Sequence, residues 1–146
     1  MKRPILLLCG ALLAISTSVT RAQEDHAYTL GPVTVVSFVR TEPGMFDEYL
    51  RYLSNTYKKL MEAQKKQGIV TDYAVYQALP RDAQDADLIL TVTYKNMAAF
   101  DTLQASTDPL VKEVFGSLPK AASASADREK LRKQLGSQMV RQLILK

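Results

Sequence analysis

Tyrosines, carboxylates and arginines are the side chains of this sequence that could do chemistry, because it holds one histidine, one cysteine and no tryptophan. His26 precedes the first expected element, and we interpret it as a solvated side chain. No pair of histidines, HExxH pattern or calcium-loop pattern occurs, so the sequence indicates no metal site. A Ser-His-Asp site needs a positioned imidazole, which His26 does not offer. We therefore expect no catalytic residue set, no metal and no cofactor.

A binding pocket is the better prediction, since a pocket needs apolar walls and only a few polar groups. The candidates are aromatic and polar residues on one side of the expected strands, the side turned away from the helices. They are Phe38, Asp72 or Tyr73, Tyr76, Thr91, Thr93 and Arg141. Because side chains alternate along a strand, a register shift of one residue would exchange the faces for the whole set. Asp72 is interpreted as exposed or paired with an arginine rather than catalytic.

The segment FVRTEPGMFDEYLRYL, residues 38–53, joins two of the elements that would position these residues. Before the joint, Pro32–Arg40 is rich in β-branched residues and predicts a strand. Pro43-Gly44 then favours a tight turn. After it, apolar residues recur every three or four positions over Phe46–Met61, which predicts one amphipathic helix. Gly68 is a suitable C-terminal stop for that helix.

The rest of the chain predicts three more strands and further helical segments. Residues of high β-propensity predict strands at Ile69–Leu79 and Leu88–Tyr94, separated by the polar turn Pro80–Asp87. A last strand is expected at Ser137–Lys146. The other expected segments are a helix capped by Asn96 that runs through Phe100 and Leu103, a short piece around Pro109–Phe115, an Ala/Ser-rich loop at Leu118–Lys130, and a helix near Asp127–Leu135 that ends at Gly136.

The order β-α-β-β-α-β is the plan of a ferredoxin-like α+β domain, with four antiparallel strands and helices on one face. The expected strands, such as Pro32–Arg40, carry apolar residues on both sides. The sheet face without helices therefore needs a cover. A second copy of the chain is the simplest cover, so we expect a homodimer.

Three stretches of the sequence, VVSFVRTEPGMFDEYLRYL, KKQGIVTDYAVYQ and DLILTVTYKNMAAFDTL, resemble the dimeric α/β-barrel superfamily over about Val33 to Leu103. Its members include antibiotic-biosynthesis-type monooxygenases, stress-responsive barrel proteins and EthD-like proteins. The resemblance implies two ferredoxin-like subunits whose sheets form a barrel, but no particular activity, because the superfamily hosts unrelated chemistries. Its cofactor-free monooxygenases use an Asn, a Trp and a His, and its haem-binding members use a His ligand. This chain has no tryptophan and one histidine, His26, so no catalytic residue is carried over.

The N-terminus predicts a signal peptide over residues 1–22. A basic start is followed by the apolar run Ile5–Ile15 and by Thr20 and Ala22 at the −3 and −1 positions of a cleavage site before Gln23. The run is shorter than the roughly 20 residues of a membrane-spanning helix, so we expect no membrane anchor after cleavage, with a retained anchor as the alternative. The mature protein would be periplasmic or secreted, with a flexible lead-in at 23–31 and one domain at 32–146.

Cleavage would also change the charge and the redox chemistry of the chain. The full sequence has 19 basic and 15 acidic residues, and loss of Lys2, Arg3 and Arg21 would leave 16 against 15. Such a balance is not typical of nucleic-acid binding, and we interpret the basic cluster 128–133 as a solvated helix face. Cys9 would leave with the signal, which excludes disulfides and thiol chemistry in the mature protein.

Two functions remain open on these observations. The first is an exported dimer that binds a small apolar or aromatic molecule, or that acts only as a non-catalytic module. The second is a cofactor-free enzyme of the monooxygenase or isomerase kind, which would use tyrosine, Asp72 and Arg141. The lack of a tryptophan and of a positioned histidine favours the first.

Overall fold

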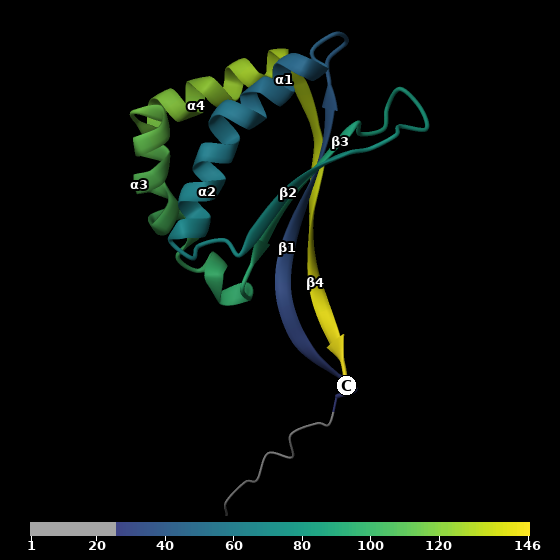
Figure 1. The fold of residues 1–146 in the computed structure, drawn as a ribbon, viewed down its shortest axis with the longest axis vertical. Coiled ribbons are helices and arrows are strands. Elements are labelled where there is room, and N and C mark those ends of the chain that lie inside the picture. Colours follow the sequence, from purple (N-terminus) through teal and green to yellow (C-terminus); the bar gives the residue numbers. More distant parts are fainter. Residues whose placement is uncertain (1–25) are drawn as a thin grey trace, which may run out of the picture.

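The computed structural model describes residues 26–146 as an antiparallel sheet with helices on one face (Figure 1). The strands are β1 (Tyr28–Thr41), β2 (Asp72–Gln77), β3 (Leu88–Tyr94) and β4 (Arg132–Leu145), in the spatial order β2-β3-β1-β4. All three pairings are antiparallel, and β1 and β3 form the centre of the sheet. This is the strand order of the split βαβ plan. The predicted ferredoxin-like α+β fold is confirmed.

The joint between β1 and the first helix has the geometry expected of its Pro-Gly pair. Gly44 has a φ of 77°, and the amide of Met45 donates to the carbonyl of Glu42 at 2.9 Å. Helix α1 (Phe46–Tyr52) begins directly after this turn. The predicted long helix is continuous through the π-helical turn η1 (Leu53–Tyr57) into α2 (Lys58–Lys66), after which Gly68 has a φ of 70°.

Replacing Gly44 by Val is expected to lower the free energy of unfolding by about 1–3 kcal/mol, because a β-branched residue is strained at positive φ. No atom lies within 4 Å of a Cβ built at this position, so the cost comes from the backbone alone. Gly44→Asn should cost less, since Asn tolerates this conformation. Thermal melts of both variants beside Glu42→Ala would measure the effect, and equal midpoints for all three would contradict it.

The region before the last strand differs from its prediction. Leu118–Asp127 is helix α4 rather than a loop, because Ser117 accepts a hydrogen bond from the Lys120 amide and Pro119 occupies the first turn. The alanines that follow favour helix. The short piece expected at Pro109–Phe115 is the second half of a longer helix, α3 (Leu103–Phe115), preceded by the 3₁₀ turn η2 (Met97–Phe100).

The helix expected near Asp127–Leu135 is also wrong. Only the 3₁₀ turn η3 (Arg128–Lys130) forms, and β4 begins at Arg132, which pairs with Thr41 of β1. Gly136 does not end a helix but lies inside β4 at φ 144°, beside an irregularity in the register with β1. Pairing with the long central strand therefore overrides the local helical pattern of these residues.

Strands β1 and β4 extend together beyond the rest of the sheet as a two-stranded ribbon (Figure 1). β1 begins at Tyr28, which pairs with Leu145, so residues 28–31 belong to the domain and not to a lead-in. His26 stacks on Tyr28 with ring centroids 5.6 Å apart. The predicted signal peptide, 1–22, lies outside the described residues.

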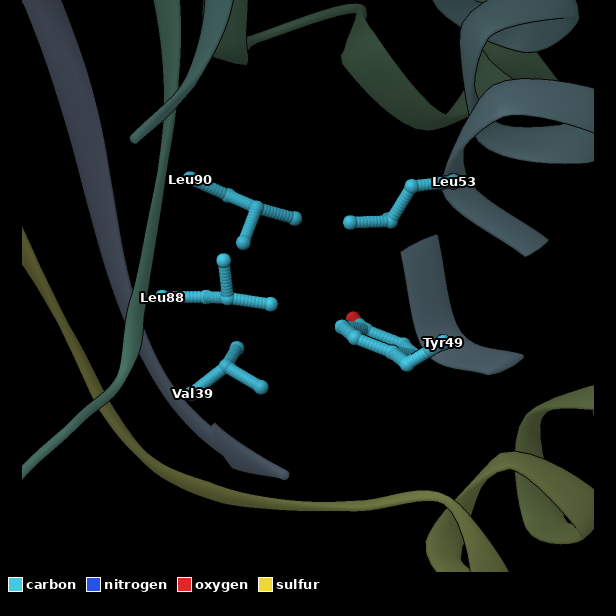
Figure 2. Packing of buried hydrophobic residues seen from close by; sticks show 5 residues of the cluster. All are labelled: Val39, Tyr49, Leu53, Leu88 and Leu90. Carbon is cyan, nitrogen blue, oxygen red and sulfur yellow. The ribbon is translucent and has the colours of Figure 1, made fainter. Parts of the chain in front are cut away.

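The core lies between the helices and the sheet. Val39, Leu88 and Leu90 point from the sheet toward Tyr49 and Leu53 of the helical layer (Figure 2). Each of these five side chains is at most 8% exposed, and Leu88 is 1% exposed. This packing shows which side chains lie on which face of the sheet. Val39 and Leu88 lie on the helix-covered face, so the residues that alternate with them along each strand lie on the face that no helix covers (Figure 1).

Candidate functional site

The register of the sheet places most of the predicted ligand-binding residues on the uncovered face. Tyr76 pairs with Ile89 and Ile89 with Phe38, which forms an apolar row across three strands. Thr91 and Thr93 lie on the same face, and the hydroxyl of Thr93 is 3.0 Å from that of Thr34. This face thus presents aromatic, aliphatic and hydroxyl groups.

Of the other three predicted residues, only Asp72 shares this face, through its pairing with Thr93. Tyr73 lies on the helix-covered face and donates to the Glu62 carboxylate at 2.5 Å. Arg141 pairs with the buried Val33 and therefore shares its face, opposite to Phe38. Asp72 accepts a hydrogen bond from Lys65 at 3.0 Å, which lowers the pKa of its carboxyl. The side chain of Asp72 is 68% exposed and has a cation partner, although the partner is a lysine and not an arginine.

Two neighbouring hollows lie instead on the helix side of the sheet. The smaller is a cavity of about 160 Å³ between the sheet and the helical layer. The larger is a cleft of about 580 Å³ between α1–η1 on one side and α3, α4 and η3 on the other. Tyr52 and Arg128 line both. The cavity is lined by Ser37, Val39, Tyr49, Tyr52, Leu53, Tyr57, Leu90, Arg128, Arg132 and Gln134.

Arg128 stands at the boundary of the cavity and the cleft. Its guanidinium carbon lies 4.9 Å from the ring centroid of Tyr52, a cation–π contact. It donates to the Tyr52 hydroxyl at 2.9 Å and to the Ser125 hydroxyl at 3.0 Å. Both acceptors are neutral, and within residues 26–146 no carboxylate forms a salt bridge with Arg128. Its positive charge is therefore held in place but not compensated.

Two buried polar atoms of the cavity lining lack a hydrogen-bond partner among the described residues. They are the hydroxyl of Tyr57 and Nε of Arg132. Arg132 is 7% exposed, and another of its nitrogens donates to Glu129 at 2.9 Å. Buried polar groups are almost always hydrogen-bonded, so unsatisfied ones need an explanation. A molecule in the cavity that accepts hydrogen bonds would satisfy both.

The backbone explains why Tyr57 reaches this cavity. It is the last residue of the π-helical turn Leu53–Tyr57, and such turns shift the side chains that follow them and are frequent at functional sites. Its ring meets that of Tyr73 edge-on at 6.1 Å. The long helix thus presents Leu53 and Tyr57 to the same cavity.

The tyrosines of the cavity are proton donors at neutral pH. Burial raises the pKa of Tyr57, and the neighbouring tyrosines add to the effect. Burial also raises the pKa of Tyr49, against the opposing influence of the Arg132 charge, and that of Tyr52 against Arg128. These hydroxyls therefore stay protonated and can donate to a ligand oxygen, but they cannot act as bases at neutral pH.

Replacing Tyr57 by Phe is expected to leave stability unchanged or to raise it by up to about 1 kcal/mol, because it removes a buried hydroxyl without a partner. The matched change Tyr52→Phe should lower stability by about 0.5–1.5 kcal/mol, since that hydroxyl accepts a hydrogen bond from Arg128. Urea denaturation of the ligand-free protein would compare the two. A larger loss for Tyr57→Phe would show that its hydroxyl has a partner after all.

Sequence reasoning missed the central residues of this site. The sequence predicts that Arg128 and Arg132 lie on a solvated helix face, yet Arg132 is buried and is the first residue of strand β4. Tyr57 fits the apolar stripe of the predicted helix and Tyr52 lies in the same helix, and neither position indicates a cavity. The available signal was a pair of arginines just before a strand, which becomes informative only when the strand register is known. No group of three or more potential metal-ligating His, Cys, Asp or Glu residues occurs within residues 26–146.

No protein-family model matches the sequence, and the comparison with curated proteins finds no match. Among solved structures, HapK from Hahella chejuensis is similar with a TM-score of 0.52 and 12% identity, over 75% of this chain and 91% of HapK. A dimeric ferredoxin-like protein from an uncultured marine organism has a TM-score of 0.49 and 6% identity, over 81% and 90% of the two chains. One of unknown function from Thermobifida fusca has a TM-score of 0.46 and 13% identity, over 78% and 92%.

These likenesses concern the fold. The chain shares its fold with HapK, which agrees with the architecture that the resemblance predicts. At such low identity the activity of a neighbour does not transfer to this chain.

Proposed function

We propose that the protein is an exported dimeric module that binds a small apolar or aromatic molecule in the cleft between α1–η1 and α3–α4. The observation that carries the proposal is the pair of unsatisfied buried polar atoms, on Tyr57 and Arg132, in a cavity that shares the lining residues Tyr52 and Arg128 with this cleft. Val114, Phe115 and Tyr52 supply apolar walls, and a volume of about 580 Å³ lies in the range of small-molecule pockets.

A binding role is better supported than a cofactor-free enzyme. An enzyme would need a base, and the tyrosines of the cavity have raised pKa values. The acids nearest to it are engaged: Asp127 pairs with Lys130 and Glu129 with Arg132, each at 2.9 Å. Asp72 and Arg141, which the enzymatic alternative would combine, lie on opposite faces of the sheet by their register.

A bulky residue in the cleft tests the binding role. Ala124 lines the cleft on α4, and Ala124→Trp should fill part of it. Binding of the neutral aromatic probe N-phenyl-1-naphthylamine, followed by its fluorescence, should weaken at least about fivefold, since one displaced ring contact is worth about 1 kcal/mol or more. The matched variant Ala122→Trp, at an exposed position of the same helix, should bind like the wild type. Equal binding by both variants would place the probe elsewhere.

A second copy of the chain is the proposed cover of the uncovered sheet face. That face presents Val36, Phe38, Ile89 and Tyr76, and Val140 of β4 is 41% exposed. The projecting ribbon adds Ile144 to this face, which is 47% exposed, while Leu30, Leu143 and Leu145 alternate to the other side of the ribbon. An apolar surface of this extent on a small protein is typical of an interface. A homodimer with facing sheets would bury it.

Export of the protein is part of the same proposal, and it predicts cleavage before Gln23. The basic start, the run Ile5–Ile15 and the small residues before Gln23 support it. The described residues contain no helix long and apolar enough to cross a membrane. Intact-mass measurement after expression with its own N-terminus should show loss of residues 1–22. A full-length product retained in the cytoplasm would reject export.

A further inference from the structure

The charges around the proposed cleft are unbalanced, and they indicate the chemistry of its ligand. The cations of the cleft and cavity are Lys120, Arg128, Lys130 and Arg132, and the acids are Asp127 and Glu129. Lys130 and Arg132 each have one of these acids as a partner. Lys120 and Arg128 form no salt bridge within the described part of the chain. An excess of two positive charges remains.

The uncompensated charge is concentrated where the two hollows meet. Arg128 is partly buried there and lines the cavity together with the buried Arg132, whose Nε has no acceptor. The hydroxyl of Tyr57 is a further unused donor in the same lining. Two guanidinium groups and a phenol around one small cavity form a set of donors with little acceptor capacity of its own. Arginine is suited to a carboxylate, because its planar fork can donate two parallel hydrogen bonds.

Resting on the proposed function, we propose that the ligand is an amphiphilic carboxylic acid. Its carboxylate lies in the cavity between Arg128 and Arg132 and accepts a hydrogen bond from Tyr57. Its apolar body passes Tyr52 and lies in the cleft against Val114 and Phe115. The volumes of the two hollows suit this division. The cavity, at about 160 Å³, is larger than a carboxylate and similar to a cavity that holds one benzene ring. The cleft, at about 580 Å³, has room for a larger apolar group.

A carboxylate fits the cavity better than a phosphate. Val39, Leu53 and Leu90 form part of the wall, so the bound group must lose most of its water. Removing water from a doubly charged phosphate costs much more than from a singly charged carboxylate. Inorganic phosphate should therefore not compete with the ligand.

The test compares an acid with a neutral alcohol of the same ring system, 2-naphthoate against 2-naphthalenemethanol, by isothermal titration at pH 7. We expect the acid to bind at least about tenfold more tightly, because charge-assisted hydrogen bonds are about twice as strong as neutral ones. In Arg128→Gln the two affinities should become equal within about twofold. Arg128→Lys keeps the charge and should retain part of the preference. Arg81→Gln, a change of the same kind at an 88% exposed side chain, should behave like the wild type.

The outcomes separate the two proposals. Equal binding of acid and alcohol by the wild type, unchanged in Arg128→Gln, would overturn the carboxylate inference and leave the binding role standing. Binding of neither compound up to millimolar concentration, together with no binding of the neutral probe, would overturn both. Displacement of 2-naphthoate by inorganic phosphate at similar concentration would replace the carboxylate with a phosphate group and so contradict the inference.

Discussion

Replacing Leu88 by Ala is expected to lower the free energy of unfolding by about 2–5 kcal/mol, the range for a fully buried leucine. Leu88 of β3 is 1% exposed and packs between Val39 of β1 and Leu90 of β3. Its side chain points toward Tyr49 across the core (Figure 2). The change removes buried methyl groups and leaves a space that a sheet paired on both sides of β3 cannot close. Because small domains are stable by about 5–15 kcal/mol, much of the total stability is at stake.

Urea denaturation of Leu88→Ala and of Leu79→Ala would measure this loss of stability against a control in which the same atoms are removed. Leu79 lies in the turn after β2 and is 88% exposed, so its loss should change stability by less than about 0.5 kcal/mol. Both variants need to be measured at the same protein concentration, because the proposed dimer would couple concentration to stability. If the two substitutions lower the free energy of unfolding equally, the principal core does not lie on the helix-covered face of the sheet.

Replacing Ile89 by Lys is expected to convert the proposed dimer to a folded monomer. Ile89 is central in the apolar row of the uncovered face, between Phe38 and Tyr76. A symmetric interface would bury two of the new charges close together, so we expect association to weaken by about 3 kcal/mol or more, roughly a hundredfold in dissociation constant. In the monomer the same lysine is on the surface, so folding should persist.

Light scattering and circular dichroism together decide this prediction. The wild type should have twice the mass of the chain at micromolar concentration, and Ile89→Lys should have the mass of one chain with unchanged secondary structure. Leu79→Lys, the same kind of change at an exposed turn residue, should remain dimeric. A wild type that is monomeric at these concentrations would remove the homodimer proposal. A dimeric Ile89→Lys would place the interface elsewhere, and the projecting β1–β4 ribbon would be the next surface to test.

The sequence by itself determined the order and type of the elements in its first two thirds. β-Branched runs, the Pro-Gly turn and the stripe of Phe46–Met61 are local signals, and the structure has β1, the α1–α2 helix and β3 where they predict them. Leu88–Tyr94 is correct to the residue. Local signals suffice here because each element is long relative to its turns and because Gly44 and Gly68 mark the helix ends with positive φ.

The last third needed the tertiary structure, because non-local pairing competes there with local preference. Residues 132–135 have a helical pattern but join β4, since β1 offers them a partner strand. The Ala/Ser-rich segment forms α4 because Ser117 and Pro119 begin a helix there. The periodicity of the sequence alone predicts neither this strand nor this helix.

The candidate site was decided almost entirely by tertiary structure. Phe38, Thr91, Thr93 and Tyr76 do share a face, as alternation predicts, but that face is the one that no helix covers (Figure 1). The hollow lies on the other side, where the π-helical turn and the start of β4 bring Tyr57 and Arg132 together from positions 75 residues apart. Sequence specifies which side chains can donate hydrogen bonds. Only the packing of helix on sheet decides which of those donors are buried together without an acceptor.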